Sequence, residues 1–181
     1  MLVAHRGGGR LAPENTMVAF QSALDDWGAD MLELDVRLSR DGVVMVIHDE
    51  TVDRTTDGTG RVSEFTLAEL KEFDAGYRFE DLEGAPSFRG RGVRIPTLRE
   101  LMEACPHVWL NIEAKEAQVA GPLVETIRSF DAEYRVLVAA EHERNRVDAS
   151  GYQGPWGASR TDCLLFWALH RLPGGGGFTP N

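Results

Sequence analysis

The sequence lacks the features that define several common classes of protein. Only two cysteines occur, Cys105 and Cys163, so neither a disulfide framework nor a cysteine-based metal site is expected, and both are predicted to be buried thiols. Long hydrophobic runs are missing too, because no stretch reaches the roughly 18 apolar residues of a membrane span. Residues 1–4 form a strand-like start without a basic leader, so a cytoplasmic location is expected.

Positive charge is scarce as well. The 19 Lys and Arg residues are outnumbered by 29 Asp and Glu residues, which gives a formal net charge of -10. A broad basic patch is therefore not expected, and neither nucleic acid nor an anionic membrane surface is a predicted partner. Any phosphate must be bound locally. The 181 residues, 43% of them hydrophobic, suit one soluble domain with a sizeable core.

Short apolar segments alternate with segments of helical periodicity. The first predicted strand ends at His5, and a helix from Asn15 or Thr16 to Gly28 carries apolar residues at helical spacing. These residues are Phe20, Ala23, Leu24 and Trp27. Further strands are predicted over residues 31–38, 43–48, 109–115 and 135–140, and capped helices begin at Thr66, Thr97 and Pro122.

Two of the predicted strands have one apolar face and one polar face. In residues 31–38 the even positions are aliphatic, and the odd positions carry Glu33, Asp35 and Arg37. Residues 109–115 divide in the same way, with Glu113 and Lys115 on the polar face. Since alternate side chains of a strand share a face, and the apolar face is expected to pack on helices, the polar face is predicted to line an enclosed lumen.

Alternating strands and helices with polar residues at strand ends favour an α/β fold, a (β/α)8 barrel of TIM type. Such barrels have about 250 residues, and five strands with a sixth candidate are visible here, so the barrel is predicted to be incomplete at its C-terminus. The whole chain, residues 1–181, is predicted to be one domain with a small insertion at about 49–96. Residues 141–181 are assigned only a helix at 164–169. An open doubly wound sheet is the structural alternative.

Several short motifs with charged or polar residues follow one another along the chain. They are His5-Arg6-Gly7-Gly8-Gly9, Pro13-Glu14-Asn15-Thr16, Glu33-Leu34-Asp35, His48-Asp49, Arg54-Thr55-Thr56-Asp57-Gly58 and Asn111-Ile112-Glu113-Ala114-Lys115. In their order and spacing they resemble the glycerophosphodiester phosphodiesterase family, from Met1 to about Ala140. The family's closing strands are not found after that point.

The resemblance implies a metal site formed by Glu33, Asp35 and Glu113. Carboxylate oxygens without cysteine favour a hard cation, so one Mg²⁺ or Ca²⁺ is the expected cofactor. Arg6 and Lys115 are implied to bind the substrate phosphate.

His5 and His48 match the family's acid/base pair, and an ordinary histidine pKa of about 6.5 suits both roles near neutrality. Glu14 is a secondary candidate that would orient Arg6 or the metal site. The remaining histidines, His107, His142 and His170, are predicted to be surface residues.

The implied activity is metal-dependent hydrolysis of small-molecule glycerophosphodiesters to glycerol 3-phosphate and an alcohol. Attack by the substrate's own glycerol hydroxyl and direct attack by water both stay open. The alternative is an inactive, truncated barrel that only binds phosphoryl ligands. A phosphatidylinositol-specific phospholipase C is a rival within the same class, which the Glu113-Ala114-Lys115 strand disfavours. The sequence carries no signal for oligomeric state, the identity of the metal or the head group.

Overall fold

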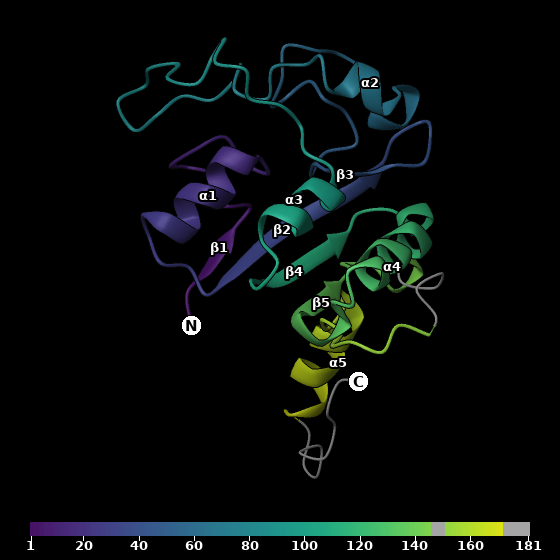
Figure 1. Ribbon diagram of the computed structural model, residues 1–181. Coiled ribbons are helices and arrows are strands. Elements are labelled where there is room, and N and C mark those ends of the chain that lie inside the picture. The colour runs from purple at the N-terminus through teal and green to yellow at the C-terminus, as the bar shows by residue number, and fades with distance from the viewer. Residues whose placement is uncertain (146–150, 172–181) are drawn as a thin grey trace.

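The computed structural model describes residues 1–145 and 151–171, and these residues contain one five-stranded sheet (Figure 1). Four strands lie in the order β1-β2-β4-β5, and β3 pairs with the carboxyl end of β2. The strands are β1 (Val3–His5), β2 (Met31–Leu38), β3 (Val44–Val46), β4 (Trp109–Ala114) and β5 (Val136–Ala139).

Helices occupy the connections between the strands. The α-helices are α1 (Met17–Asp25), α2 (Leu67–Leu70), α3 (Leu98–Ala104), α4 (Ala120–Ser129) and α5 (Arg160–Leu169). Single 3-10 turns are η1 (Val62–Glu64), η2 (Ala117–Val119), η3 (Glu133–Arg135) and η4 (Glu143–Asn145). Among the described residues, no helix is both long enough and apolar enough to cross a membrane.

The register of the sheet aligns the strand ends. Strands β1, β2, β4 and β5 are parallel, with His5 opposite Glu33 and Asp35 opposite Glu113. Only β3 runs antiparallel, because a tight turn at Gly42 returns the chain along the end of β2. The carboxyl ends of the parallel strands therefore meet at one edge of the sheet.

The predicted division into two faces is confirmed. Leu32, Leu34 and Val36 of β2 are completely buried, as are Leu110 and Ile112 of β4. They belong to a hydrophobic core that includes apolar residues of α1, α3 and α4, which pack along the sheet in Figure 1. The opposite face carries the acidic and basic side chains, so packing of the apolar face fixes where those side chains point.

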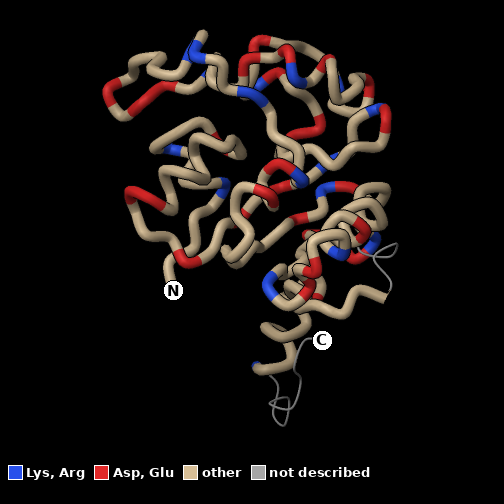
Figure 2. The backbone as a smooth tube through the Cα atoms, viewed as in Figure 1, with Lys and Arg blue, Asp and Glu red and all other residues tan. Residues whose placement is uncertain are grey.

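Residues 49–96, the predicted insertion, have a small core of their own. Val52, Val62 and Leu70 pack there with Met45 and Ile47 from the end of the β3 region. Acidic and basic positions are mixed along this segment, as Figure 2 shows. Met45 and Ile47 thereby anchor the segment beside the strand ends, and its status as an insertion stays a prediction.

Some sequence-based expectations differ from the structure in detail. The third strand ends at Val46, not His48. The amide of Ile47 still donates to the carbonyl of Asp35, but the chain bends at residues 48–50 and leaves the sheet. Trp27 lies beyond the end of α1 and is 57% exposed, since the helix ends before Gly28, where a left-handed residue closes it as predicted.

The two cysteines also differ from each other. Cys105 is buried, as predicted, whereas Cys163 is exposed, because it lies on α5, a helix that has no buried residue. The predicted helix at 164–169 is confirmed as part of α5. The Gly174–Gly177 stretch, which was not expected to form an element, lies outside the described residues.

Within the described residues the sheet is open. Strands β1 and β5 each have one neighbour in the sheet order, so neither pairs with the other to complete a cylinder. The prediction of an incomplete barrel agrees with this arrangement.

Candidate active site

Three carboxylates converge on the polar face of the sheet. One oxygen each from Glu33, Asp35 and Glu113 lies within 4.8 Å of the others, and this is the acidic group that could hold a metal ion among the described residues. The convergence follows from the sheet, because Glu33 and Asp35 share a face of β2 and Asp35 is the register partner of Glu113 on β4. Asp35 is buried, and the other two are half-buried.

Two cations lie against these carboxylates. Arg6 Nε is 3.1 Å from Asp35 Oδ2, and Lys115 Nζ is 3.4 Å from Asp35 Oδ1 and 2.9 Å from Glu113 Oε1. The backbone amide of Arg6 also donates to Glu33 Oε2 at 2.9 Å. Both predicted phosphate-binding side chains therefore reach the centre where the carboxylates meet, and there they balance part of its negative charge.

A left-handed backbone conformation brings Arg6 and Asn15 to this centre. Their φ angles are 52° and 56°, and the amide of Asn15 donates to the carbonyl of Arg6 at 3.0 Å. The buried Asn15 side chain donates from Nδ2 to Asp35 Oδ2 at 3.0 Å and accepts from the Asp35 amide at 3.3 Å. Gly7, also left-handed, follows Arg6 because a Cβ there would lie 2.9 Å from side-chain atoms of Ala19 and Phe20.

Glu33 shows the electrostatic cost of gathering the acids. Burial raises the pKa of Glu33, and the nearby charges of Asp35 and Glu113 raise it further, so these effects exceed the lowering by the Arg6 amide and His5. A bound cation would relieve this repulsion. The oxygen-only donor set, with one buried member, fits a hard divalent ion.

The two candidate catalytic histidines have different surroundings. His5 ends β1, and its Nε2 is 3.9 Å from Glu33 Oε2, with 73% of the side chain exposed. His48 follows β3, and its Nδ1 is 2.6 Å from Asp49 Oδ1. Arg37 Nε donates to the His48 carbonyl at 2.8 Å. His48 is thus held through its ring and its backbone, whereas His5 is held less tightly.

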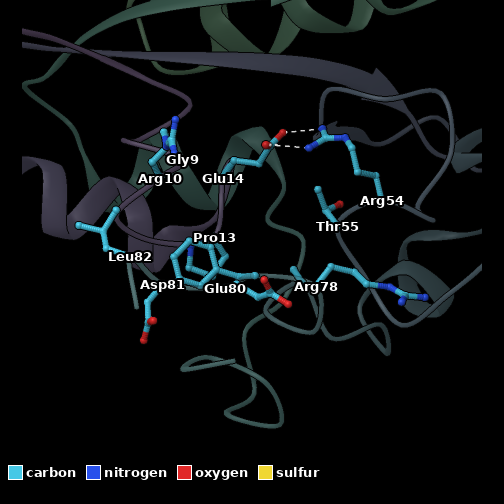
Figure 3. A pocket seen from close by; sticks show the side chains of 12 residues that line it. Gly9, Arg10, Pro13, Glu14, Arg54, Thr55, Arg78, Glu80, Asp81 and Leu82 are labelled. Carbon is cyan, nitrogen blue, oxygen red and sulfur yellow. Dashed lines mark hydrogen bonds and ion pairs between the residues drawn. The ribbon is translucent and has the colours of Figure 1, made fainter. Parts of the chain in front are cut away.

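The sequence placed Glu14 as a secondary candidate and gave no role to Asn15 or Arg54. In the structure, Glu14 Oε1 accepts from Arg6 Nη1 at 3.0 Å, and Glu14 also accepts two hydrogen bonds from Arg54 (Figure 3). These residues were all within the quoted motifs. Their partners could not be read from the motifs, because the pairs join positions up to 40 residues apart.

A cavity of about 400 Å³ borders this group of charges. Its lining joins the loop after β1 to the 49–96 segment, with Glu14 and Arg54 facing each other across one side (Figure 3). The unpredicted contribution of the 49–96 segment is therefore to supply one wall beside the candidate site. Of the remaining histidines, His107, His142 and His170 are exposed as predicted.

Asp49 gives a testable dependence of stability on pH. Burial alone would raise the pKa of Asp49, but hydrogen bonds from Arg54 and His48 outweigh it and lower the pKa to about 2 from 3.8. Because the folded-state pKa is depressed, the ionised carboxylate stabilises the fold above about pH 4 and loses that contribution as the pH falls towards 2. The free energy of unfolding of the wild type, measured in urea, should decrease as the pH falls over this range. In Asp49→Asn it should decrease less steeply. Parallel curves would contradict the Asp49 contribution.

Solved structures share the fold described above. The glycerophosphoryl diester phosphodiesterase domain of an uncharacterized Mycobacterium tuberculosis protein is 27% identical with a TM-score of 0.86, over 94% of this chain and 64% of that one. A phosphodiesterase from Oleispira antarctica, solved with the product sn-glycerol-3-phosphate, is 29% identical with a TM-score of 0.73, over 87% and 64%. Fold and site together define an α/β protein of the TIM-barrel type, and the doubly wound alternative is not needed.

Sequence comparisons narrow this class to a family. The chain belongs to the glycerophosphoryl diester phosphodiesterase family, whose model matches residues 5–141. A glycerophosphodiester phosphodiesterase of Caldanaerobacter subterraneus subsp. tengcongensis is 43% identical over 147 residues, 77% of this chain and 57% of that protein. Human glycerophosphodiester phosphodiesterase 1 is 40% identical over 204 residues, 94% of this chain and 60% of that protein. The chain thus spans about three fifths of the length of these relatives.

Proposed function

We propose that this chain hydrolyses glycerophosphodiesters to glycerol 3-phosphate and an alcohol. The observation that carries the proposal is the cluster of three carboxylates at the carboxyl ends of parallel strands, with two cationic side chains against it. The carboxylates are those of Glu33, Asp35 and Glu113, and the cations are Arg6 and Lys115. Active sites of TIM-type barrels lie at that edge. The names of the relatives and the product in the Oleispira antarctica structure support the same activity.

The proposed cofactor is one divalent cation, Mg²⁺ or Ca²⁺, held by Glu33, Asp35 and Glu113. When bound, the cation would withdraw charge from a phosphate oxygen. Arg6 and Lys115 contribute cationic donors at the same place, where Arg6 pairs with Asp35 and Lys115 pairs with both Asp35 and Glu113. Asn15 holds Asp35 from the buried side, so the carboxylate cannot rotate without losing two hydrogen bonds.

His48 and His5 form the proposed acid/base pair. Because Asp49 accepts from Nδ1 of His48, the neutral ring carries its lone pair on Nε2, which is the atom available to take a proton. One histidine removes the proton of the attacking hydroxyl, and the other gives a proton to the oxygen of the leaving alcohol. Two nucleophiles fit this pair, the substrate's glycerol hydroxyl followed by water, or water alone.

Product analysis tests the proposed activity. We expect the 181-residue chain, with Mg²⁺ or Ca²⁺ present, to convert glycerophosphocholine to glycerol 3-phosphate and choline. The reaction is monitored by ³¹P NMR. Appearance of phosphocholine would mean that the other P–O bond is cleaved and would contradict the proposal. A transient cyclic phosphate signal would identify the glycerol hydroxyl as the first nucleophile. The single domain over 1–181 and the cytoplasmic location stay predictions.

A further inference from the structure

Arg54 joins two carboxylates that come from different loops. Its Nη1 and Nη2 donate to the two oxygens of Glu14 at 2.9 and 2.7 Å, and its Nε donates to Asp49 Oδ2 at 2.5 Å. Nη2 also reaches Asp49 Oδ1 at 3.2 Å. All three guanidinium nitrogens of Arg54 therefore donate to these two carboxylates, and the contact with Glu14 is bidentate.

Each of these acids has a second partner in the candidate site. Glu14 also accepts from Arg6, whose Nε lies against Asp35. Asp49 also accepts from Nδ1 of His48. A continuous series of ion pairs and hydrogen bonds consequently runs from Asp35 through Arg6, Glu14, Arg54 and Asp49 to His48, and Arg54 is the link between Glu14 and Asp49.

This arrangement differs from an ordinary surface ion pair. The Arg54 side chain is 48% exposed, but the side chains of Glu14 and Asp49 are only 17% and 29% exposed. The hydrogen bonds that Arg54 donates to Glu14 and Asp49 raise the pKa of Arg54, so the cation is retained at every accessible pH. Isolated exposed pairs contribute little, whereas bidentate networks fix geometry.

We propose that Arg54 is a positioning residue for His48, acting through Asp49, and that it ties this histidine to the loop after β1. The inference rests on the proposed function, in which His48 transfers a proton. Arg54 fixes the carboxylate that selects the ring tautomer of His48. Its charge also offsets that of Asp49, which limits how strongly Asp49 stabilises the protonated ring.

Charged groups from three other parts of the fold also lie around His48, and each set has oppositely charged partners. From β2, Arg37 binds the His48 carbonyl, and it also pairs with Glu116 at 3.3 Å. From the loop after β1, Glu14 lines the small cavity at His48 and is paired with Arg6 and Arg54. From the sheet, the carboxylates Glu33, Asp35 and Glu113 add negative charge that Arg6 and Lys115 partly balance. Removing the charge of Arg54 therefore leaves His48 as the charged or polar side chain that contacts the Asp49 carboxylate among the described residues.

Titration of the His48 ring by NMR tests this role without relying on turnover. The signal is assigned among the five histidines by its loss in His48→Gln. In the full 181-residue chain, Arg54→Gln should move the titration of the His48 ring to higher pH, because a nearby positive charge is removed. The limb of the kcat against pH profile that depends on His48 should shift in the same direction, and kcat at its optimum should fall about tenfold.

Arg54→Lys separates charge from geometry. It keeps the positive charge but loses the planar fork, so the His48 titration should stay at the wild-type position while kcat falls several-fold. The matched control is Arg61→Gln, since Arg61 pairs with Glu50 at 2.5 Å on the exposed surface of the same segment. This control should leave both measurements unchanged.

Two outcomes would overturn the positioning role. One is a folded Arg54→Gln with His48 titration and kcat at wild-type values, and the other, decisive if Arg54→Gln does not fold, is wild-type kcat in Arg54→Lys. Absence of glycerol 3-phosphate release by the wild type would instead refute the proposed function. The two failures are therefore distinguishable.

Discussion

Replacing His48 with alanine is expected to lower kcat for glycerophosphocholine by about 10³-fold, because a positioned acid or base contributes 10² to 10⁴. Nδ1 of the His48 ring is fixed by Asp49, and the backbone carbonyl of His48 is fixed by Arg37. Loss of the ring removes the proton-transfer atom and leaves the carboxylate group of β2 and β4 in place. Steady-state kinetics should therefore show a loss in kcat, while calorimetry shows Mg²⁺ or Ca²⁺ binding close to that of the wild type.

The matched control is His107→Ala, at an exposed histidine before β4. This variant should keep wild-type kinetics. His5→Ala is expected to lose turnover by orders of magnitude as well, since the second proton transfer has no other histidine at the strand ends. Near wild-type kcat in His48→Ala would remove His48 from the mechanism.

Asp35→Asn is expected to abolish binding of the divalent cation and to lower the free energy of unfolding of the metal-free protein by about 3 kcal/mol. Asp35 is buried, and it lies against Arg6, Lys115 and Asn15. Asparagine has nearly the same shape but no charge, so the two cations lose their shared partner in a partly covered site. Urea unfolding in chelator measures the stability, and calorimetry measures the metal.

Glu50→Gln is the appropriate control, because Glu50 forms an exposed ion pair with Arg61 and such pairs contribute at most about 1 kcal/mol. It should bind metal as the wild type does. Unchanged metal affinity in Asp35→Asn would show that the carboxylate group is structural and would remove the proposed cation site.

The sequence predicts the parts of this site that depend on strand periodicity. Alternation along β2 and β4 places Glu33, Asp35 and Glu113 on one face, and burial of Leu32, Leu34 and Ile112 confirms that alternation. The alternation is visible within the sequence of one strand, so predicting which side chains share a face needs no knowledge of contacts with other strands.

Register and loop geometry could not be predicted in the same way. The pairing of Asp35 with Glu113 depends on the register between β2 and β4, which are far apart in the sequence, and the acids converge only in that register. The roles of Asn15 and Arg54 depend on contacts between loops, which no local pattern encodes. The exposure of Cys163 shows the same limit, because an apolar helix predicts burial without saying what covers it.

The dependence of turnover on a divalent cation tests the central claim most directly. Glycerol 3-phosphate release from glycerophosphocholine is measured with the full chain after treatment with chelator and again after Mg²⁺ or Ca²⁺ is restored, alongside Glu113→Gln. We predict no release in chelator, recovery with one of the two ions, and no recovery in the variant, because Glu113 completes the carboxylate group. Release that continues at the full rate in chelator, or a folded, cation-loaded chain that releases nothing, would contradict a metal-dependent glycerophosphodiesterase.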